Sequence, residues 1–291
     1  MFKTEKLRIK NLNEFADLNS KRREFNSLNE EYFKYYNKSN FIGRYQLRKQ
    51  VCLLRYGNKL VGYLWHSKID SGANAYLINS LYVDKNYMDI NCSELLKDFK
   101  AGSVLYFDGK LSEEASNLLS RFGFEEKSTT FELKLTLNSK RHEPLIDNLN
   151  FVTFKKGRHE KIRCDIQNSV FFNFERQPLT IQDILVDEMQ DYYVNDWCIF
   201  IKYNNDYAGY GQIIMHNFTP LIVNFGIKKE YQRRGFGQLL LTHLLNILVD
   251  SGYNEVKIKV NADNTPAYEL YKKCGFKFFD QYKTWTTLIK T

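Results

Sequence analysis

The chain has 291 residues, of which 43% are hydrophobic and 15% aromatic, and its formal net charge is +8. The length allows two domains, and the apolar content is too high for a disordered chain. No apolar run reaches the roughly 18 residues of a membrane-spanning helix, and the N-terminus turns polar at once. We therefore expect a cytoplasmic protein with no signal peptide and no membrane partner.

Cysteine usage and charge exclude further classes. The five cysteines are odd in number and form no C-x-x-C pair, and the five histidines form no metal-binding pattern. We expect free thiols and no bound metal. The positive charge suits a polyanionic partner or serves solubility alone. Nucleic-acid binding is one hypothesis, but no recognition motif supports it, so we expect no nucleic-acid partner.

The N-terminal half begins its regular pattern with two strands, at 51–55 and 60–65, on either side of a Gly57-Asn58 turn. Further strands are expected at 75–83 and 105–107. An aperiodic stretch containing Pro144 follows and is typical of a linker. The expected organisation is a domain at 1–137, a linker at 138–150 and a second domain at 151–291.

The second half alternates strands and helices, so we expect a mixed α/β domain. The patterns predict a strand at 151–154, helices at 160–171 and 180–192, strands at 197–201, 207–216 and 221–227, a helix at about 238–251, a strand at 256–260 and a helix from Asn264. Gly252 and Gly275 are expected just beyond the two later helices, where glycine commonly ends a helix. The strand at 221–227 is almost continuously apolar, which indicates burial on both faces.

A glycine-containing loop, Gln232-Arg233-Arg234-Gly235-Phe236-Gly237, lies between this strand and the next helix. Its glycines allow a ligand close to the backbone, and N–H groups at a helix start favour phosphate. The P-loop pattern fails because Gln238 follows the second glycine. The dinucleotide fingerprint fails because Leu240 occupies the place of its third glycine.

The loop resembles the Gln/Arg-x-x-Gly-x-Gly/Ala pyrophosphate loop of the GNAT acyltransferase family. Downstream, the family's N-x-x-A-x-x-L-Y-x-x-x-G-F signature is matched by Asn264, Ala267, Leu270, Tyr271, Gly275 and Phe276. Residues 151–291, with elements in the family's order, are identified on this basis as a GNAT domain.

The resemblance implies acetyl-CoA as co-substrate. The amides of Gln232, Arg233, Arg234, Gly235, Phe236 and Gly237 would hold the pyrophosphate, and Phe225, Gly226 and Ile227 would pair with the pantetheine arm as an added strand would. Asn264 would hydrogen-bond near the thioester, and Gly226 suits a bulge that opens the sheet. Tyr271 matches the general acid, because a neutral phenol can protonate the leaving thiolate.

The implied activity is N-acetylation of a primary amine, on an unidentified small molecule or peptide, by direct attack on the thioester. The protein would be a monomer or a homodimer. A family glutamate that acts as base is replaced by Leu221, and neighbouring His216 and Glu230 are expected to be ordinary surface residues. The alternative is a CoA-binding sensor or scaffold without turnover, against which Tyr271 and Asn264 argue.

The first half aligns with the second, with Val83 at the position of Ile227. The later signature is represented by Ser112, Ala115, Leu118, Leu119, Gly123 and Phe124. Leu119 replaces the tyrosine, Ser112 replaces the asparagine, and the loop at 88–93 has no glycine and carries Asp89. We expect two tandem GNAT-like folds, the first degenerate and without cofactor, serving as a scaffold or as a wall of the substrate cleft.

The two helices at 160–192 border the acceptor site in this family. They and their flanks carry four acidic residues and six aromatic ones, namely Asp183, Asp187, Glu188, Asp191, Phe171, Phe172, Phe174, Tyr192, Tyr193 and Trp197. These residues would line a cleft for a cationic amine, or the aromatics belong to the core and the acids to a solvated helix face. We expect the second arrangement.

Overall fold

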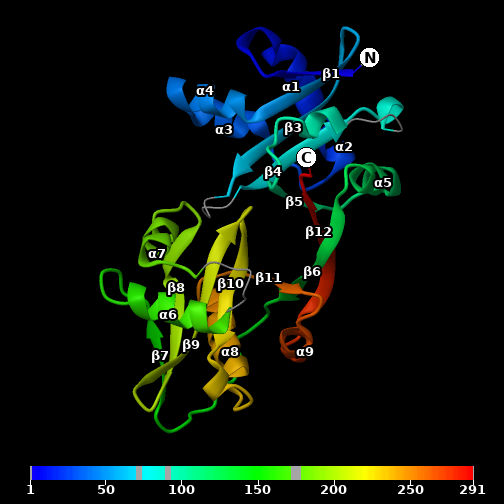
Figure 1. Cartoon of the computed structure of the whole chain (residues 1–291). Helices are drawn as coiled ribbons and strands as arrows, with labels where there is room; N and C mark the ends of the chain where they lie inside the picture. The colour runs from blue at the N-terminus through cyan, green and yellow to red at the C-terminus, as the bar shows by residue number, and fades with distance from the viewer. Residues whose placement is uncertain (1, 70–73, 89–92, 172–177, 291) are drawn as a thin grey trace. The chain divides into compact units, whose positions relative to one another are not determined.

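The computed structural model describes the chain except for residues 1, 70–73, 89–92, 172–177 and 291 (Figure 1). The strands are β1 Phe2–Lys6, β2 Val51–Tyr56, β3 Lys59–Lys68, β4 Ala75–Val83, β5 Val104–Gly109, β6 Glu125–Thr136, β7 Leu149–Thr153, β8 Tyr193–Tyr203, β9 Asp206–His216, β10 Thr219–Ile227, β11 Glu255–Asn261 and β12 Lys277–Leu288. The α-helices are α1 Leu12–Ser20, α2 Arg22–Phe25, α3 Tyr32–Lys38, α4 Phe41–Lys49, α5 Glu113–Arg121, α6 Glu160–Val170, α7 Ile181–Glu188, α8 Phe236–Asp250 and α9 Thr265–Lys273. Short 3₁₀ turns are η1 Ile9–Asn11, η2 Lys85–Tyr87, η3 Ser93–Leu96 and η4 Lys229–Tyr231. None of the described helices has the length and apolar character that a membrane crossing requires.

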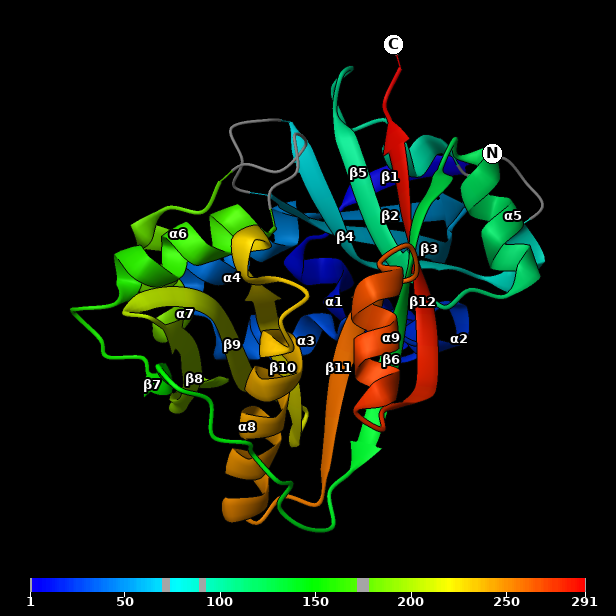
Figure 2. The same ribbon diagram turned by 90° about the horizontal axis from the view of Figure 1, so that it is seen from below.

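The chain forms two compact units. Unit 1 contains residues 1–129 and 281–291, and unit 2 contains residues 130–280. The strands of unit 1 follow the order β1-β2-β3-β4-β5-β12, and those of unit 2 the order β7-β8-β9-β10-β11-β6. Each unit has one parallel pair, β4 with β5 and β10 with β11. In unit 2 the parallel connection passes through α8, coloured yellow to orange in Figure 2.

The last strand of each unit comes from the other half of the sequence. Strand β6 follows α5, yet it pairs antiparallel with β11, for example Leu133 with Ile258. Strand β12 follows α9, yet it pairs antiparallel with β5, for example Trp285 with Phe107. The two units therefore exchange their final strands relative to the sequence segments 1–137 and 151–291.

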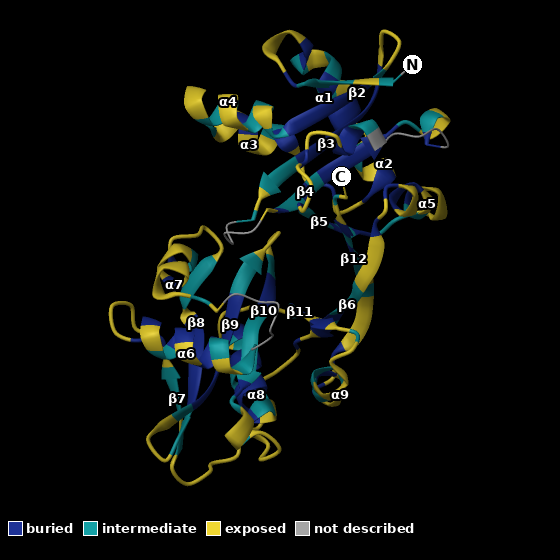
Figure 3. Ribbon diagram, in the orientation of Figure 1, coloured by how far each residue is buried: buried dark blue, intermediate teal, exposed yellow. Residues whose placement is uncertain are grey.

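Strand alternation gives the sheet of unit 2 two apolar faces. On β8, Cys198 and Phe200 pack in one cluster with Ile166 of α6, whereas Ile199 and Ile201 pack in another with the leucines of α8. Both faces are covered, and the middle of β8 is buried (Figure 3). The nearly continuous apolar character of the central strands follows from this arrangement.

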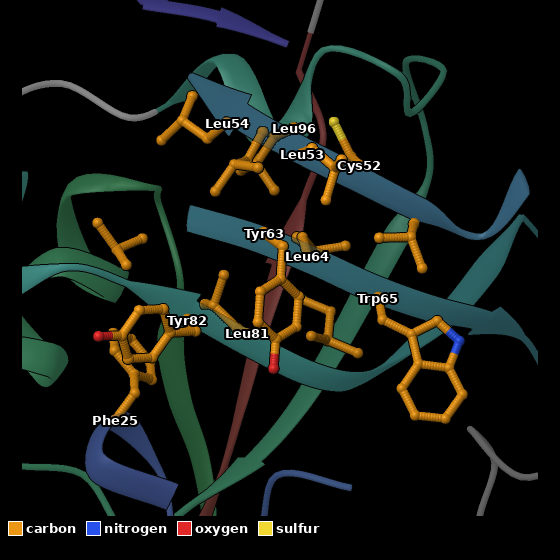
Figure 4. Packing of buried hydrophobic residues seen from close by; sticks show 14 of the residues in the cluster. Phe25, Cys52, Leu53, Leu54, Tyr63, Leu64, Trp65, Leu81, Tyr82 and Leu96 are labelled. Carbon is orange, nitrogen blue, oxygen red and sulfur yellow. The ribbon is translucent and has the colours of Figure 1, made fainter. Parts of the chain in front are cut away.

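Unit 1 has a single core built on β2, β3 and β4. Figure 4 shows side chains of all three strands in this core, together with Phe25 at the end of α2. Phe25 is buried in the same cluster as Leu81 and Tyr82 of β4. The segment after α2 therefore starts from a fixed point beside β4.

The elements predicted from the sequence are present, with one boundary that was wrong. The helix expected at 180–192 ends at Glu188, and Tyr193 already begins β8. The turn between β8 and β9 contains two left-handed residues, with φ of 47° at Asn204 and 69° at Asn205. Residues 137–148, which are all described, contain no helix or strand, but the last two residues of the linker predicted at 138–150 already belong to β7.

The described cysteines Cys52, Cys164, Cys198 and Cys274 are buried free thiols, and Cys92 lies outside the described residues. Within the described part of the chain, no group of three or more His, Cys, Asp or Glu side chains is placed to hold a metal ion.

Candidate functional site

The glycine loop forms the N-terminus of α8. Gly235 is the N-cap residue with φ of 83°, and Arg233 before it is also left-handed, with φ of 61°. The first helical hydrogen bond runs from Leu239 N to Gly235 O, so the amides of Phe236 and Gly237 have no acceptor within the helix. A Cβ on Gly235 would meet no atom within 4 Å, so the glycine serves the backbone conformation and leaves open space for a ligand.

Two side chains fix this loop to the unit. Gln232 Nε2 donates to Ile227 O at 2.9 Å, which ties the loop to the end of β10. The buried Phe236 ring packs against Tyr203, with ring centroids 5.2 Å apart. The side chains of Arg233 and Arg234 are exposed, so the helix start faces solvent with two cations beside it.

Strands β10 and β11 part before the end of β10. In the described structure they pair at Leu221 with Lys257 and at Ile222 with Ile258, and no later pair follows. Lys228 N donates to Ala208 O of β9, so backbone alternation turns the N–H and C=O of Ile227 away from β9 and toward the gap. By the same alternation about Gly226, the N–H and C=O of Phe225 also point toward the gap. The gap thus has a strand edge suited to an extended ligand.

A β-bulge accompanies this parting. The register between β10 and β9 shifts between Val223 and Gly226, and Asn224 adopts a left-handed conformation with φ of 51°. The bulge expected at Gly226 lies directly before this residue, and its left-handed residue is Asn224. Gly226 is required by packing instead, because a Cβ there would lie 2.1 Å from Val170 Cγ1 at the end of α6.

Tyr271 of α9 lies beside this edge. Its ring is 6.0 Å from the Phe225 ring at an interplanar angle of 62°, and the residue is only 5% exposed. Burial, and secondarily the neighbouring Cys274, raises the pKa of Tyr271 well above its ordinary value. The phenol is therefore protonated at neutral pH and able to donate a proton.

Asn264 has a structural contact that the motif alone did not reveal. It is the exposed N-cap of α9, and its Oδ1 accepts from Ala267 N at 3.2 Å. In unit 1, Ser112 caps α5 in the same way and accepts from Ala115 N at 3.3 Å. The two positions are equivalent in the fold even though the side chains differ.

Unit 1 parts its strands as unit 2 does. Strands β4 and β5 pair at three positions, from Ala75 with Val104 to Leu77 with Tyr106. Asp84 N donates to Val61 O of β3, so alternation turns the backbone groups of Leu81 toward β5. Leu81 stands two residues before Val83, as Phe225 stands two before Ile227.

Two asparagines fill this gap in unit 1. The Asn29 side chain donates to Leu81 O at 2.7 Å and accepts from Leu81 N at 3.1 Å. The Asn26 side chain donates to Asp108 O at 2.8 Å and accepts from Lys110 N at 3.0 Å, on the β5 side. Both are almost fully buried, with 1% exposure for Asn26 and 4% for Asn29. The segment after α2 thus bonds the backbone groups of Leu81, the counterpart of Phe225 on β10.

The other sequence differences between the units agree with a filled gap in unit 1. Leu119, at the position of Tyr271, is fully buried in the core and has no titratable group. The predicted degenerate loop at 88–93 lies largely outside the described residues, and only 3₁₀ turns flank it where unit 2 has α8.

The residues considered for the acceptor site have different surroundings in the structure. Trp197 is buried and packs edge-on against Tyr253, 5.4 Å away, and Asp183 forms a capping box with Thr180. These two are structural, as expected. Asp187 instead pairs with the buried Arg163, and Phe172 and Phe174 lie outside the described residues.

The alternative bases lie on the surface. His216 and Glu230 are both exposed, and Leu221 is buried at the start of β10. The described residues near Tyr271 thus provide a proton donor, whereas no base has been located by sequence reasoning.

The match to a known protein family falls within unit 2. Residues 165–276 match the model of the Acetyltransferase (GNAT) family. This part of the chain is thus similar to the GNAT family. A mycothiol acetyltransferase from Arthrobacter sp. (strain FB24) is 24% identical over 190 residues, which cover 58% of this chain and 55% of the relative. The chain thus spans about half the length of this curated relative.

Two solved structures resemble the whole chain in fold. A GCN5-related N-acetyltransferase from Sphaerobacter thermophilus has a TM-score of 0.72 at 15% identity, covering 100% of this chain and 96% of that one. A tandem GNAT protein from the clavulanic acid biosynthesis pathway has a TM-score of 0.62 at 14% identity, covering 99% and 98%. The expected fold class, two tandem GNAT-like α/β folds, is confirmed.

Sequence reasoning missed two sets of polar residues. One is the pair Asn26 and Asn29 in unit 1. The other is a buried network in unit 2 that joins Arg163, Asp187, Gln212 and Asn224. Neither set has a motif, because their partners are backbone groups or residues far apart in sequence. A polar Gln212 within the apolar β9 was the one visible signal.

Proposed function

We propose that unit 2 is an acetyl-CoA-dependent N-acetyltransferase that acts on a primary amine of a small molecule or a peptide. The observation that carries this proposal is the edge of β10 beyond its last described pairing with β11. It lies between the N-terminus of α8 and the buried phenol of Tyr271, so one extended ligand can contact all three. A phosphate-bearing end fits the helix start, and a thioester fits the neighbourhood of the phenol.

Each residue of the site has a role in this proposal. The amides of Gln232, Arg233, Arg234, Gly235, Phe236 and Gly237 receive the pyrophosphate. Phe225, Gly226 and Ile227 form the strand edge for the pantetheine arm, and the Ile227 N–H polarises the acyl carbonyl. Asn264 adds a contact from the start of α9. These assignments agree with the exposed loop and the direction of the Ile227 backbone.

The chemistry requires one proton donor. As the N–C bond forms and the C–S bond breaks, the leaving sulfur takes up negative charge, and Tyr271 donates its phenolic proton to it. The raised pKa of Tyr271 keeps this proton in place at neutral pH. The proton that the amine loses passes to solvent or to a base.

We further propose that unit 1 holds no cofactor. Asn26 and Asn29 already bond the backbone groups that a pantetheine arm would need. Displacing them would leave buried polar groups unpaired, at a cost of about 1–3 kcal/mol each.

The direct test is a panel of primary amines with acetyl-CoA, scored by release of the CoA thiol and by the mass of the acetylated product. The panel includes peptide N-termini and the unacetylated form of mycothiol, since mycothiol acetyltransferases are among the relatives. Turnover with at least one amine, lost in Tyr271→Phe, supports the proposal. Tight acetyl-CoA binding without transfer to any amine would favour the sensor or scaffold hypothesis.

A further inference from the structure

A buried side-chain amide lies beneath α6, on the face of the unit 2 sheet opposite α8. Gln212 of β9 has no exposed surface. Its Oε1 accepts hydrogen bonds from Arg163 Nη2 at 3.0 Å, Asn224 Nδ2 at 3.0 Å and the Tyr210 hydroxyl at 3.4 Å. A single oxygen thus links helix α6 to the bulge of β10.

The other end of the same amide is fixed as well. Gln212 Nε2 donates to Asp187 Oδ2 at 3.2 Å, and that carboxylate also accepts from Arg163 and from the Tyr192 hydroxyl. A flipped amide would turn its N–H groups toward the guanidinium and its oxygen toward the carboxylate. The ion pair of Arg163 and Asp187 therefore permits one orientation of Gln212.

Asn224 is the residue that this orientation controls. Asn is one of the few residues besides glycine that adopt the left-handed backbone readily, and the bond of its side chain to Gln212 selects this conformation among those open to it. The bulge contains one residue more than the opposite stretch of β9, and removing it would shift the register by one. The Ile227 N–H would then point at β9 instead of at the gap.

We propose that Gln212 is a positioning residue that acts through Asn224 to hold the β10 bulge, and so aims the Ile227 N–H at the acyl carbonyl. The inference rests on the proposed function, because it presumes that an acyl carbonyl occupies the gap. Gln212 touches no reacting atom. Arg163 and Asp187 set its orientation from α6 and α7.

A purely structural role would be different. The same network would then only hold α6 and α7 on the sheet, and its loss would lower stability without changing the bound thioester. The required readout is therefore the thioester carbonyl itself. Its ¹³C resonance in bound [1-¹³C]acetyl-CoA reports the hydrogen bond that it accepts.

Two variants break the network at different points. Gln212→Met removes the amide at nearly constant volume. Asn224→Gly removes the tether but tolerates the left-handed conformation, so it remains informative even where Gln212→Met fails to fold. Gln167→Met is the matched control, since Gln167 is a buried amide of α6 itself and its Nε2 has no partner among the described residues.

The expected result is that Gln212→Met and Asn224→Gly each move the bound carbonyl resonance by about half or more of the way to its free value. The dissociation constant of acetyl-CoA changes less than about threefold, since the pyrophosphate contacts remain. The double variant resembles the more severe single one, and the control keeps the native resonance.

An unchanged resonance in Asn224→Gly would overturn the inference, as would an equal shift in Gln167→Met. A different failure would concern the proposed function itself: the unaltered protein would then show no bound carbonyl resonance at all. The two failures are distinguished by the first spectrum.

Discussion

The two units part the same pair of strands and use the opening differently. In unit 2 the edge of β10 has its Ile227 backbone N–H turned away from β9, toward the gap, with a helix N-terminus at one end and a phenol beside it. In unit 1 the edge of β4 is bonded by Asn29, and the edge of β5 by Asn26.

This difference shows what the parting of strands requires. Backbone groups released from a ladder need partners, and either a ligand or the protein's own side chains can provide them. Unit 1 fills the gap with two asparagines, whose amides reproduce the donor and acceptor pattern of a backbone. We propose that a GNAT-like fold persists without a cofactor when its gap is filled from within in this way.

The largest expected effect concerns the start of α8 in unit 2. Gly235→Asp places a carboxylate where a pyrophosphate would bind and imposes a side chain on a backbone with φ of 83°. We expect acetyl-CoA binding to weaken by about a thousandfold, measured by calorimetry. Gly252→Asp is the control, because Gly252 has φ of 80° at the opposite end of the same helix, with no atom near its Cβ position. Equal loss in both variants would contradict the assignment of the site.

Tyr271→Phe should separate chemistry from binding. Removing the hydroxyl is expected to lower kcat about a hundredfold, while the acetyl-CoA dissociation constant stays within about twofold. Steady-state kinetics with an accepted amine, together with calorimetry, measure both. Tyr268→Phe on the same helix should change neither quantity. An undiminished kcat in Tyr271→Phe would exclude the phenol as the proton donor.

The fold could be predicted further than the site. The strand and helix order of unit 2 follows from apolar periodicity, and the loop at 232–237 and Tyr271 follow from local motifs. The exchange of β6 and β12 could not be predicted, because both strands alternate in the same way and either could complete either sheet. Asn26, Asn29 and Gln212 were missed because their roles depend on partners distant in sequence.

Asn29→Ala tests whether the gap of unit 1 is filled for stability. The change leaves the N–H and C=O of Leu81 unpaired in a buried site, so we expect unit 1 to lose about 2–3 kcal/mol. Hydrogen exchange of peptides from β4 measures this loss, and the exposed Asn37→Ala is the control. Acetyl-CoA affinity should be unaffected. Native protection of β4 in Asn29→Ala would show that the contact contributes little.

The smallest expected effect is a flat alkaline pH profile. Because burial raises the pKa of Tyr271 above the ordinary tyrosine value of about 10, the proton-donating form persists as pH increases. We expect kcat/KM to show no decline assignable to Tyr271 below about pH 10. A decline near pH 8 that disappears in Tyr271→Phe would mean that the phenol ionises far more easily than its burial implies.

Calorimetric titration of acetyl-CoA into the full chain tests the difference between the units most directly. One site per chain is the predicted stoichiometry. In unit 2 the edge of β10 faces the gap, whereas in unit 1 Asn29 bonds the edge of β4. Two sites would contradict the filled gap of unit 1, and no binding would contradict the open site of unit 2.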